Sequence, residues 1–224
     1  MASIFDILGP VMVGPSSSHT AGAVRIGLIS RQLLGRRPKR ATIYFHGSFA
    51  ATGEGHGTDR AIVAGLLGMK PDDMRIPNSF EIARDEGMEF TIQKKEIRGA
   101  HPNTVQMLLE ADGTDNLKIQ ACSIGGGRIM VNKLDDIDVN FNAESNTLIV
   151  HNEDQPGHVA EVAAILNQKN INIATMQLFR DKRGGYAVMV IETDQIISEA
   201  AIEWLRDLKG IIKVTFLNVN HSGE

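Results

Sequence analysis

Two histidine-containing segments of this sequence combine residue types that could bind an anion and move a proton. The first, residues 14–20, reads Gly-Pro-Ser-Ser-Ser-His-Thr, and the second, residues 56–61, reads His-Gly-Thr-Asp-Arg-Ala. Each joins an imidazole, which exchanges protons near neutral pH, to hydroxyl groups and to a glycine or proline turn. The chain has a single cysteine, Cys122, so we expect these segments to supply only part of an active site.

The serines at 16–18 precede a segment whose apolar spacing predicts a helix over residues 20–34. A helix start presents free backbone N–H groups and a partial positive charge, which favour a carboxylate or a phosphate. Ordinary N-capping by Ser18 or Thr20 is the alternative interpretation. A cap needs only one hydroxyl, however, and does not account for the adjacent His19.

Two further histidines lie where turns are predicted. His56 stands between two glycines, which would let the backbone approach a ligand closely, and it precedes a predicted helix over 58–67. His101 begins the turn His-Pro-Asn at 101–103. An ordinary loop histidine is the alternative for both. We expect no zinc site, because these histidines do not have the i, i+4 spacing of helical metal ligands and no nearby cysteine completes a set.

The first 142 residues are predicted to form an α+β domain. Helices are expected over 20–34 and 58–67, and strands over 41–46, 89–97, 104–110, 118–123 and 128–132. Gly125–Gly127 is interpreted as a turn between two of these strands, since it lacks the Gly-Lys-Ser/Thr ending of a phosphate-binding loop. Cys122 lies in an apolar strand and is expected to be a buried small hydrophobe.

A more regular pattern follows a polar stretch near residues 135–146. Residues 147–150 predict a strand, the turn at 154–157 opens a helix, and 171–179 and 185–192 predict a hairpin. A second amphipathic helix over 197–208 ends at Gly210, and a last strand covers 212–216. The order βαββαβ predicts a ferredoxin-like α+β domain over residues 147–219, followed by a tail at 220–224.

Composition narrows the class of protein. The net charge of −4 and the isoelectric point near 6.0 argue against general nucleic-acid binding. No apolar run approaches the roughly 20 residues needed to cross a bilayer, and the start of the sequence lacks the features of a signal peptide, so we expect no membrane partner. One cysteine excludes an internal disulfide. We therefore expect a cytoplasmic protein.

The motifs together resemble one family. Residues 14–20 and 56–61, with His-Pro-Asn-Thr at 101–104 and Gly125–Gly127, are similar to the beta chain of the two-chain bacterial form of iron–sulfur-dependent L-serine dehydratases. Residues 154–159, Asp-Gln-Pro-Gly-His-Val, resemble an ACT domain, a small-molecule regulatory module that is often paired with a second copy. The family's first domain resembles the substrate-sensing domain of some phosphoglycerate dehydrogenases.

The resemblance implies conversion of L-serine to pyruvate and ammonia. It implies a [4Fe–4S] cluster with one open iron that coordinates the substrate, and such a cluster needs about three or four thiolate ligands. With one cysteine, this chain would act only with an alpha chain that holds the cluster. It holds no metal in this interpretation.

Residue roles follow from motif position. We assign the base that removes the Cα proton to His56 and the role of partner or proton donor to His19, although the sequence does not distinguish the two. The remaining residues assigned to substrate binding are Ser16, Ser17, Ser18 and Thr20 on the carboxylate, with Thr58, His101 and Asn103 nearby.

The second domain could bind an amino acid at the start of its first helix. The assigned residues are Asp154, Gly157 and His158, and we also expect self-association through this domain. The alternative for the whole chain is a non-catalytic, amino-acid-sensing regulatory subunit. A stand-alone serine hydrolase is not favoured, because the sequence has no Gly-x-Ser-x-Gly elbow.

Overall fold

The computed structural model of the chain describes residues 11–219, which divide into two compact units between Asp135 and Asp136. Each unit combines helices with one sheet, and the predicted α+β class is confirmed. The predicted domain limits at 142 and 147 stay a prediction, and the predicted tail at 220–224 lies outside the described residues.

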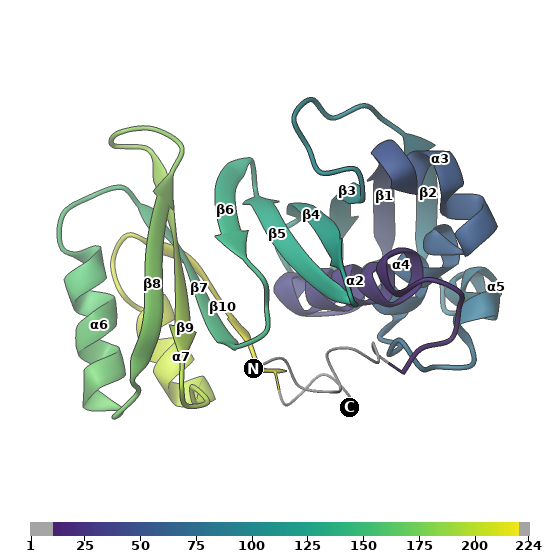
Figure 1. Ribbon diagram of the computed structural model, residues 1–224. Coiled ribbons are helices and arrows are strands. Elements are labelled where there is room, and N and C mark those ends of the chain that lie inside the picture. The colour runs from purple at the N-terminus through teal and green to yellow at the C-terminus, as the bar shows by residue number, and fades with distance from the viewer. Residues whose placement is uncertain (1–10, 220–224) are drawn as a thin grey trace, which may run out of the picture. The chain divides into compact units, whose positions relative to one another are not determined.

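The first sheet has the strand order β2-β1-β3-β4-β5-β6 (Figure 1). Its strands are β1 (Arg40–Phe45), β2 (Glu89–Lys94), β3 (Thr104–Glu110), β4 (Leu117–Gly125), β5 (Arg128–Leu134) and β6 (Ile137–Phe141). Strand β1 pairs in parallel with β2 and antiparallel with β3, and the pairs β3–β4 and β4–β5 are antiparallel. The turn between β4 and β5 is formed by Gly125–Gly127, all three with positive φ, as predicted.

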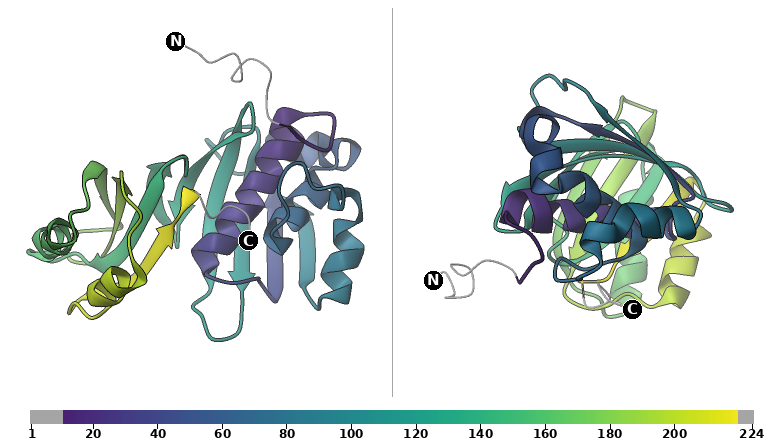
Figure 2. Two further views of the ribbon diagram at one scale, coloured as in Figure 1. Left: turned by 90° about the horizontal axis from the view of Figure 1, so that it is seen from below. Right: turned by 90° about the vertical axis from the view of Figure 1, so that its right-hand side faces the viewer.

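The helices of the first unit are α2 (Gly22–Leu34), α3 (Gly47–His56), α4 (Thr58–Leu67) and α5 (Ser79–Asp85), with a π-helical turn η1 (Ser17–Ala21) before α2 and a 3-10 turn η2 (Ile76–Asn78) before α5. Helix α2 lies against β4 and β5 and packs along α4 (Figure 2). The backbones of α2 and α4 meet at two glycines. A Cβ on Gly65 would lie 2.1 Å from the carbonyl oxygen of Val24, and one on Gly27 would lie 2.4 Å from that of Ile62.

Three elements of this part of the chain were not predicted. Helix α3 contains Gly53 and Gly55, which disfavour helix, so His56 is the last residue of a helix and not part of a loop. Helix α5 is short, and β6 falls in the polar stretch near residues 135–146, for which no strand was predicted. Strand β6 alternates buried apolar residues (Ile137, Val139, Phe141) with exposed polar ones, which is a half-buried strand pattern.

The second unit has the predicted βαββαβ order. Its elements are β7 (Asn146–Glu153), α6 (His158–Gln168), β8 (Ile173–Arg180), β9 (Tyr186–Thr193), α7 (Glu199–Arg206) and β10 (Ile211–Leu217). The antiparallel order β10-β7-β9-β8 puts the last strand beside the first, and the second strand at the opposite edge, which is the ferredoxin-like arrangement.

One sheet face of this unit carries both helices. Leu148 and Val150 of β7 share a core cluster with Val162 of α6 and Leu205 of α7. Strand β6 pairs with β5 in the six-stranded sheet but belongs by its contacts to this second unit, where it lies against β8 and β9. Helix α7 begins at the Ser198 cap, whose hydroxyl accepts from a backbone N–H in its first turn.

Candidate active site

The serine-rich segment folds into the π-helical turn that precedes α2. Ser16 caps it, because its hydroxyl accepts a hydrogen bond from the backbone N–H of His19 at 3.2 Å and its carbonyl accepts from that of Thr20 at 2.8 Å. Short π-helical turns are rare and often lie at functional sites. The serine segment is thus a structural cap and at the same time surrounds a histidine.

Hydroxyl groups face both ring nitrogens of His19. Nδ1 lies 3.3 Å from Oγ of Ser18 and 3.5 Å from Oγ of Ser16. On the opposite side, Nε2 lies 3.0 Å from Oγ of Ser48 and 3.2 Å from Oγ1 of Thr52, both on α3. A ring held between hydroxyls can donate or accept at either nitrogen, because each hydroxyl can do both.

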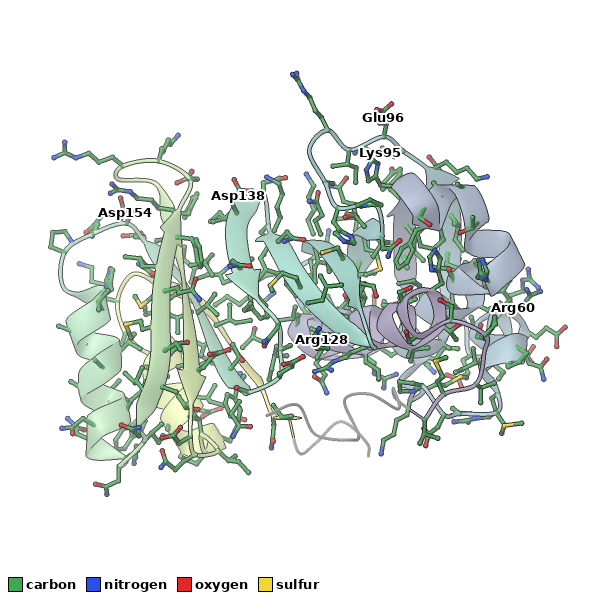
Figure 3. The ribbon with its side chains drawn as sticks, in the orientation of Figure 1. Arg60, Lys95, Glu96, Arg128, Asp138 and Asp154 are labelled. Atoms are coloured by element: carbon green, nitrogen blue, oxygen red, sulfur yellow. The ribbon has the colours of Figure 1, made fainter. Side chains whose placement is uncertain are left out.

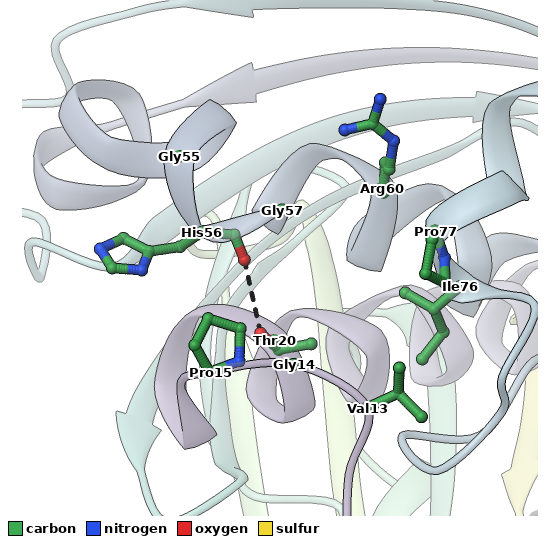
Figure 4. A pocket seen from close by; sticks show the side chains of 10 residues that line it. All are labelled: Val13, Gly14, Pro15, Thr20, Gly55, His56, Gly57, Arg60, Ile76 and Pro77. Atoms are coloured by element: carbon green, nitrogen blue, oxygen red, sulfur yellow. Dashed lines mark hydrogen bonds between the residues drawn. The ribbon is translucent and has the colours of Figure 1, made fainter.

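His56 lies beside His19 at the junction of α3 and α4. The two ring centroids are 5.2 Å apart. Gly57 follows with φ of 67°, a conformation that glycine adopts readily, and this turn lets α4 begin at once. The hydroxyl of Thr20 donates to the carbonyl oxygen of His56 at 3.5 Å, which links the two predicted motifs directly (Figure 4).

The surroundings of His19 lower its pKa. Partial burial, which disfavours the charged ring, is the main cause, and the like charge of His56 adds to it. A hydrogen bond to the Ser48 backbone opposes the shift. At neutral pH His19 is therefore held in the neutral form, which can accept a proton.

A pocket of about 440 Å³ opens beside the His56 turn (Figure 4). Both motifs contribute to its lining, which comprises Val13, Gly14, Pro15, Thr20, Gly55, His56, Gly57, Arg60, Ile76 and Pro77. Arg60 extends at the side of α4, where its guanidinium lies over the ring of Phe80, 5.3 Å from the centroid. Arg60 gives this largely apolar wall a positive charge, which suits a small molecule that bears a carboxylate, while the His56 ring extends from its turn away from Arg60 and Ile76 (Figure 4).

The other predicted binding residues fall into two groups. Thr58 is fully buried at the start of α4, and its hydroxyl has no hydrogen-bond partner within the described residues. His101 and Asn103 lie in one exposed turn, where the Asn103 backbone N–H donates to Nδ1 of His101 at 3.1 Å. This turn reaches the site through its backbone, since Ser48 N–H donates to the carbonyl of Pro102 at 2.7 Å.

Sequence reasoning missed Ser48 and Thr52. They stand one helical turn apart on α3, and both face Nε2 of His19. A weak signal was present, because Ser48 and Thr52 have the i, i+4 spacing that places two side chains on one helix face. The signal was overlooked because Gly53 and Gly55 lower the helix propensity of this segment, so no helix was predicted there.

The comparisons with known proteins agree with the two-unit fold. The sequence model for the serine dehydratase beta chain matches residues 3–85, and that for the ACT domain matches residues 146–210. The protein named probable L-serine dehydratase, beta chain, of Bacillus subtilis is 41% identical over 95% of this chain and 96% of its own length. The L-serine dehydratase beta chain of Peptoniphilus asaccharolyticus is 34% identical over 88% of this chain and 90% of its own.

The chain belongs to the L-serine dehydratase beta-chain family. The family predicted from the motifs is therefore confirmed, together with its C-terminal ACT domain. A more distant similarity extends to the D-3-phosphoglycerate dehydrogenase of Archaeoglobus fulgidus, 25% identical over 88% of this chain but only 37% of that enzyme.

The residues predicted to bind a ligand in the ACT domain are used within the fold (Figure 3 shows Asp154). The Asp154 carboxylate accepts from the backbone N–H of Gly184 at 2.8 Å and from Arg180 at 3.2 Å, and these bonds lower its pKa. His158 is buried, with Nδ1 at 3.1 Å from the Glu161 carboxylate. Gly157 precedes α6 with φ of 110°. Ligand binding here stays a prediction.

An iron–sulfur cluster, as expected for this family, does not fit the side chains of this chain. Cys122 is its single thiol, lies buried in β4, and has a pKa raised by burial. Among residues 11–219, no group of three or more His, Cys, Asp and Glu side chains is placed to hold a metal ion.

No helix in the described part of the chain is long and apolar enough to cross a membrane. The cytoplasmic location expected from the sequence stays a prediction.

Proposed function

We propose that this chain is the beta subunit of a two-chain L-serine dehydratase, which converts L-serine to pyruvate and ammonia. The observation that carries the proposal is the full-length similarity to two proteins named as beta chains of that enzyme. The site supports it, because both motifs that predicted the family meet at the His19–His56 pair beside a pocket.

The reaction requires a base for the Cα proton of serine and the departure of its β-hydroxyl group as water. The resulting aminoacrylate then hydrolyses to pyruvate and ammonia. We assign the proton transfer to the two imidazoles, since a histidine base is near its optimal pKa at neutral pH. The lowered pKa of His19 keeps its ring neutral, as a proton acceptor must be, and His56 is exposed, where it can reach a substrate.

We assign the substrate carboxylate to the serine segment and its helix start. The hydroxyls of Ser16, Ser17 and Ser18 and the backbone N–H groups of this turn supply donors, while Arg60 at the pocket supplies a positive charge. Thr20 positions the two motifs, because its hydroxyl is engaged with the His56 carbonyl. Departure of the β-hydroxyl is assigned to the partner alpha chain and its [4Fe–4S] cluster, since this chain has one thiol.

Reconstitution tests this proposal. The purified chain alone is expected to be colourless and inactive, because it lacks ligands for a cluster. Co-expression with a cysteine-bearing alpha chain under anaerobic conditions is expected to give pyruvate from L-serine. A cluster-loaded complex without pyruvate formation would contradict the proposal. Iron bound stoichiometrically by the isolated chain would contradict the division of labour between the two chains.

A second candidate is a non-catalytic, amino-acid-sensing subunit. The similarity to D-3-phosphoglycerate dehydrogenase favours it, because that match covers both units of this chain but only 37% of the enzyme. The same two-unit module therefore occurs attached to a protein of a different name. Calorimetric titration of the isolated chain with L-serine, combined with an absence of turnover in the complex, would favour this second function.

We also propose that the ACT domain mediates self-association. Strands β8 and β10 form the edges of its sheet, and Leu178 on β8 and Ile212 on β10 are about half exposed. Unpaired sheet edges with apolar side chains favour pairing with a second copy. Sedimentation of the full chain over a range of concentrations tests this: a dimer is expected, and a monomer at every concentration would contradict it.

A further inference from the structure

We propose that Ser48 and Thr52 of α3 fix the tautomer of His19, so that Nε2 carries the ring proton and Nδ1, beside Ser18, is the proton-accepting atom. The two α3 residues are then positioning residues for a catalytic histidine. The tautomer itself is independent of the reaction, while its catalytic consequence rests on the function proposed above.

The hydroxyl proton of Thr52 is already used within its own helix. Its Oγ1 donates to the carbonyl oxygen of Ser48, one turn earlier in the same helix, at 2.9 Å. A hydroxyl has a single proton, so Oγ1 of Thr52 can only accept from the imidazole nitrogen that lies 3.2 Å away. Nε2 of His19 must therefore be the donor, since a deprotonated Nε2 would set two lone pairs against each other.

The hydroxyl of Ser48 lies on the same side of the ring, with Oγ 3.0 Å from Nε2 of His19. This hydroxyl can donate or accept, so it fixes no tautomer by itself. Once Thr52 makes Nε2 the donor, Oγ of Ser48 accepts as well, and one helical turn supplies both acceptors.

The opposite ring nitrogen, Nδ1, then carries the lone pair. A neutral imidazole protonated at Nε2 keeps its lone pair on Nδ1. Nδ1 lies 3.3 Å from Oγ of Ser18, which can donate to it, whereas Oγ of Ser16 already accepts from the His19 backbone N–H. The basic atom of His19 thus points into the serine segment, among the groups that we assign to the substrate carboxylate.

The tautomer sets the side of the His19 ring at which a proton is taken up. A proton taken up by His19 enters at Nδ1, on the side of the serine segment, and the Nε2–H bond toward α3 stays in place. The protonated ring then donates on both sides without moving. Thr52 sets this polarity, because its single proton is donated to the Ser48 carbonyl, whereas the hydroxyls of Ser16, Ser18 and Ser48 can serve either as donors or as acceptors.

Nitrogen NMR of the full chain labelled with ¹⁵N-histidine tests the tautomer without any need for activity. The His19 signal is assigned by its loss in His19→Gln. At a pH above its titration, the wild-type ring is expected to show the shifts of the Nε2–H form. In Thr52→Val, which keeps the shape but removes the hydroxyl, the two tautomers are expected to mix, and Thr52→Ser is expected to restore the Nε2–H form.

The control is Thr175→Val on β8, which removes a hydroxyl bonded to Glu192 in the other unit. It is expected to leave the His19 shifts unchanged. A wild-type Nδ1–H form would overturn the proposal. A Nε2–H form that persists in the double variant Ser48→Ala, Thr52→Val would overturn the role of α3.

Kinetics of the reconstituted complex give the catalytic consequence. Thr52→Val is expected to lower kcat by about two- to tenfold with little change in KM, because only the fraction of rings in the Nε2–H form keeps Nδ1 free to accept the proton while carboxylate binding is retained. Thr52→Ser is expected to recover most of the rate. A normal kcat in Thr52→Val with a mixed tautomer would overturn the positioning role. A wild-type complex without turnover would instead count against the proposed function, and the NMR result would still decide the tautomer.

Discussion

His19 and His158 stand in the two units in similar sequence settings, and their surroundings are opposite. Each lies at a helix start after a turn that contains glycine and proline. His19 is half-buried, has hydroxyls on both ring nitrogens and lies beside a second histidine and a pocket. His158 is 9% exposed and pairs with Glu161, and Gly210 packs against its other nitrogen.

The difference shows what separates a reactive histidine from a structural one. In His158, Nδ1 faces a carboxylate partner, and Nε2 is buried without a hydrogen-bond partner within the described residues. Hydroxyl partners leave His19 able to exchange protons, and it lies beside His56, which lines a pocket. Residue type and helix position were the same in the sequence, so the contacts of the ring nitrogens decide the role.

Removing either imidazole of the first unit is the strongest test of this contrast. In the reconstituted complex, His19→Ala and His56→Ala are each expected to lower kcat by about 10²–10⁴-fold, the usual contribution of proton transfer. The visible spectrum of the cluster is expected to stay unchanged, because neither residue would bind iron. Near-normal kcat in both variants would show that the assigned chemistry is wrong.

The glycine contact between α2 and α4 gives the next largest effect. Gly65→Ala is expected to destabilise the chain by about 1–3 kcal/mol, since its Cβ would overlap the Val24 carbonyl. Urea unfolding measures the change. Gly55→Ala is the matched control: its Cβ would meet nothing within 4 Å and it lies in α3, so it is expected to stabilise by up to about 1 kcal/mol. Equal stability of the two variants would refute the close contact.

Replacing His158 tests the same comparison at the second histidine. His158→Gln is expected to leave kcat of the complex within about twofold of wild type, because the side chain touches no reacting group. The loss of its pairing with the half-exposed Glu161 is expected to cost less than about 1 kcal/mol in unfolding experiments. A large fall in kcat with normal stability would mean that His158 communicates with the catalytic unit.

Titration of His19 gives the smallest effect. Its pKa is expected below the ordinary value of 6.5, with partial burial as the main cause and His56 as the second. The unfolded chain then binds this proton more tightly than the folded one, so the contribution to stability falls as pH drops from about 6.5 toward the lower pKa. NMR titration measures the shift, and His56→Gln is expected to raise the pKa. An unchanged pKa in that variant would exclude the interaction between the rings.

Helices and strands with a periodic apolar pattern were mostly predicted from the sequence. Elements that form because of contacts distant in the sequence were mostly missed. The apolar periods of α6 and α7 and the alternation of β10 were enough for the ferredoxin-like unit. Helix α4 and strand β3 were found with their observed bounds. Helix α3 was missed because glycines at 53 and 55 lower helix propensity and no apolar face compensates, so tertiary packing decides its conformation.

The same limit applied to the site. His19 and His56 were found because their motifs combine imidazole, hydroxyl and glycine within a few residues. Ser48 and Thr52 were not found, since they act on His19 only after α3 has folded against the serine segment. The burial of Thr58 could not be predicted from the sequence either, because a threonine at a helix start can be a capping residue whether it is exposed or buried.

Because α2 and α4 touch at Gly27 and Gly65, the number of residues between each motif and its glycine fixes where that motif lies. The same number of residues separates Thr20 from Gly27 as separates Thr58 from Gly65, about two helical turns in each case. Inserting one residue in either interval would rotate that end of the site by about 100° around its helix axis and raise it by about 1.5 Å. Engineered relatives can therefore exchange residues within these intervals, but they cannot change the length of one interval alone.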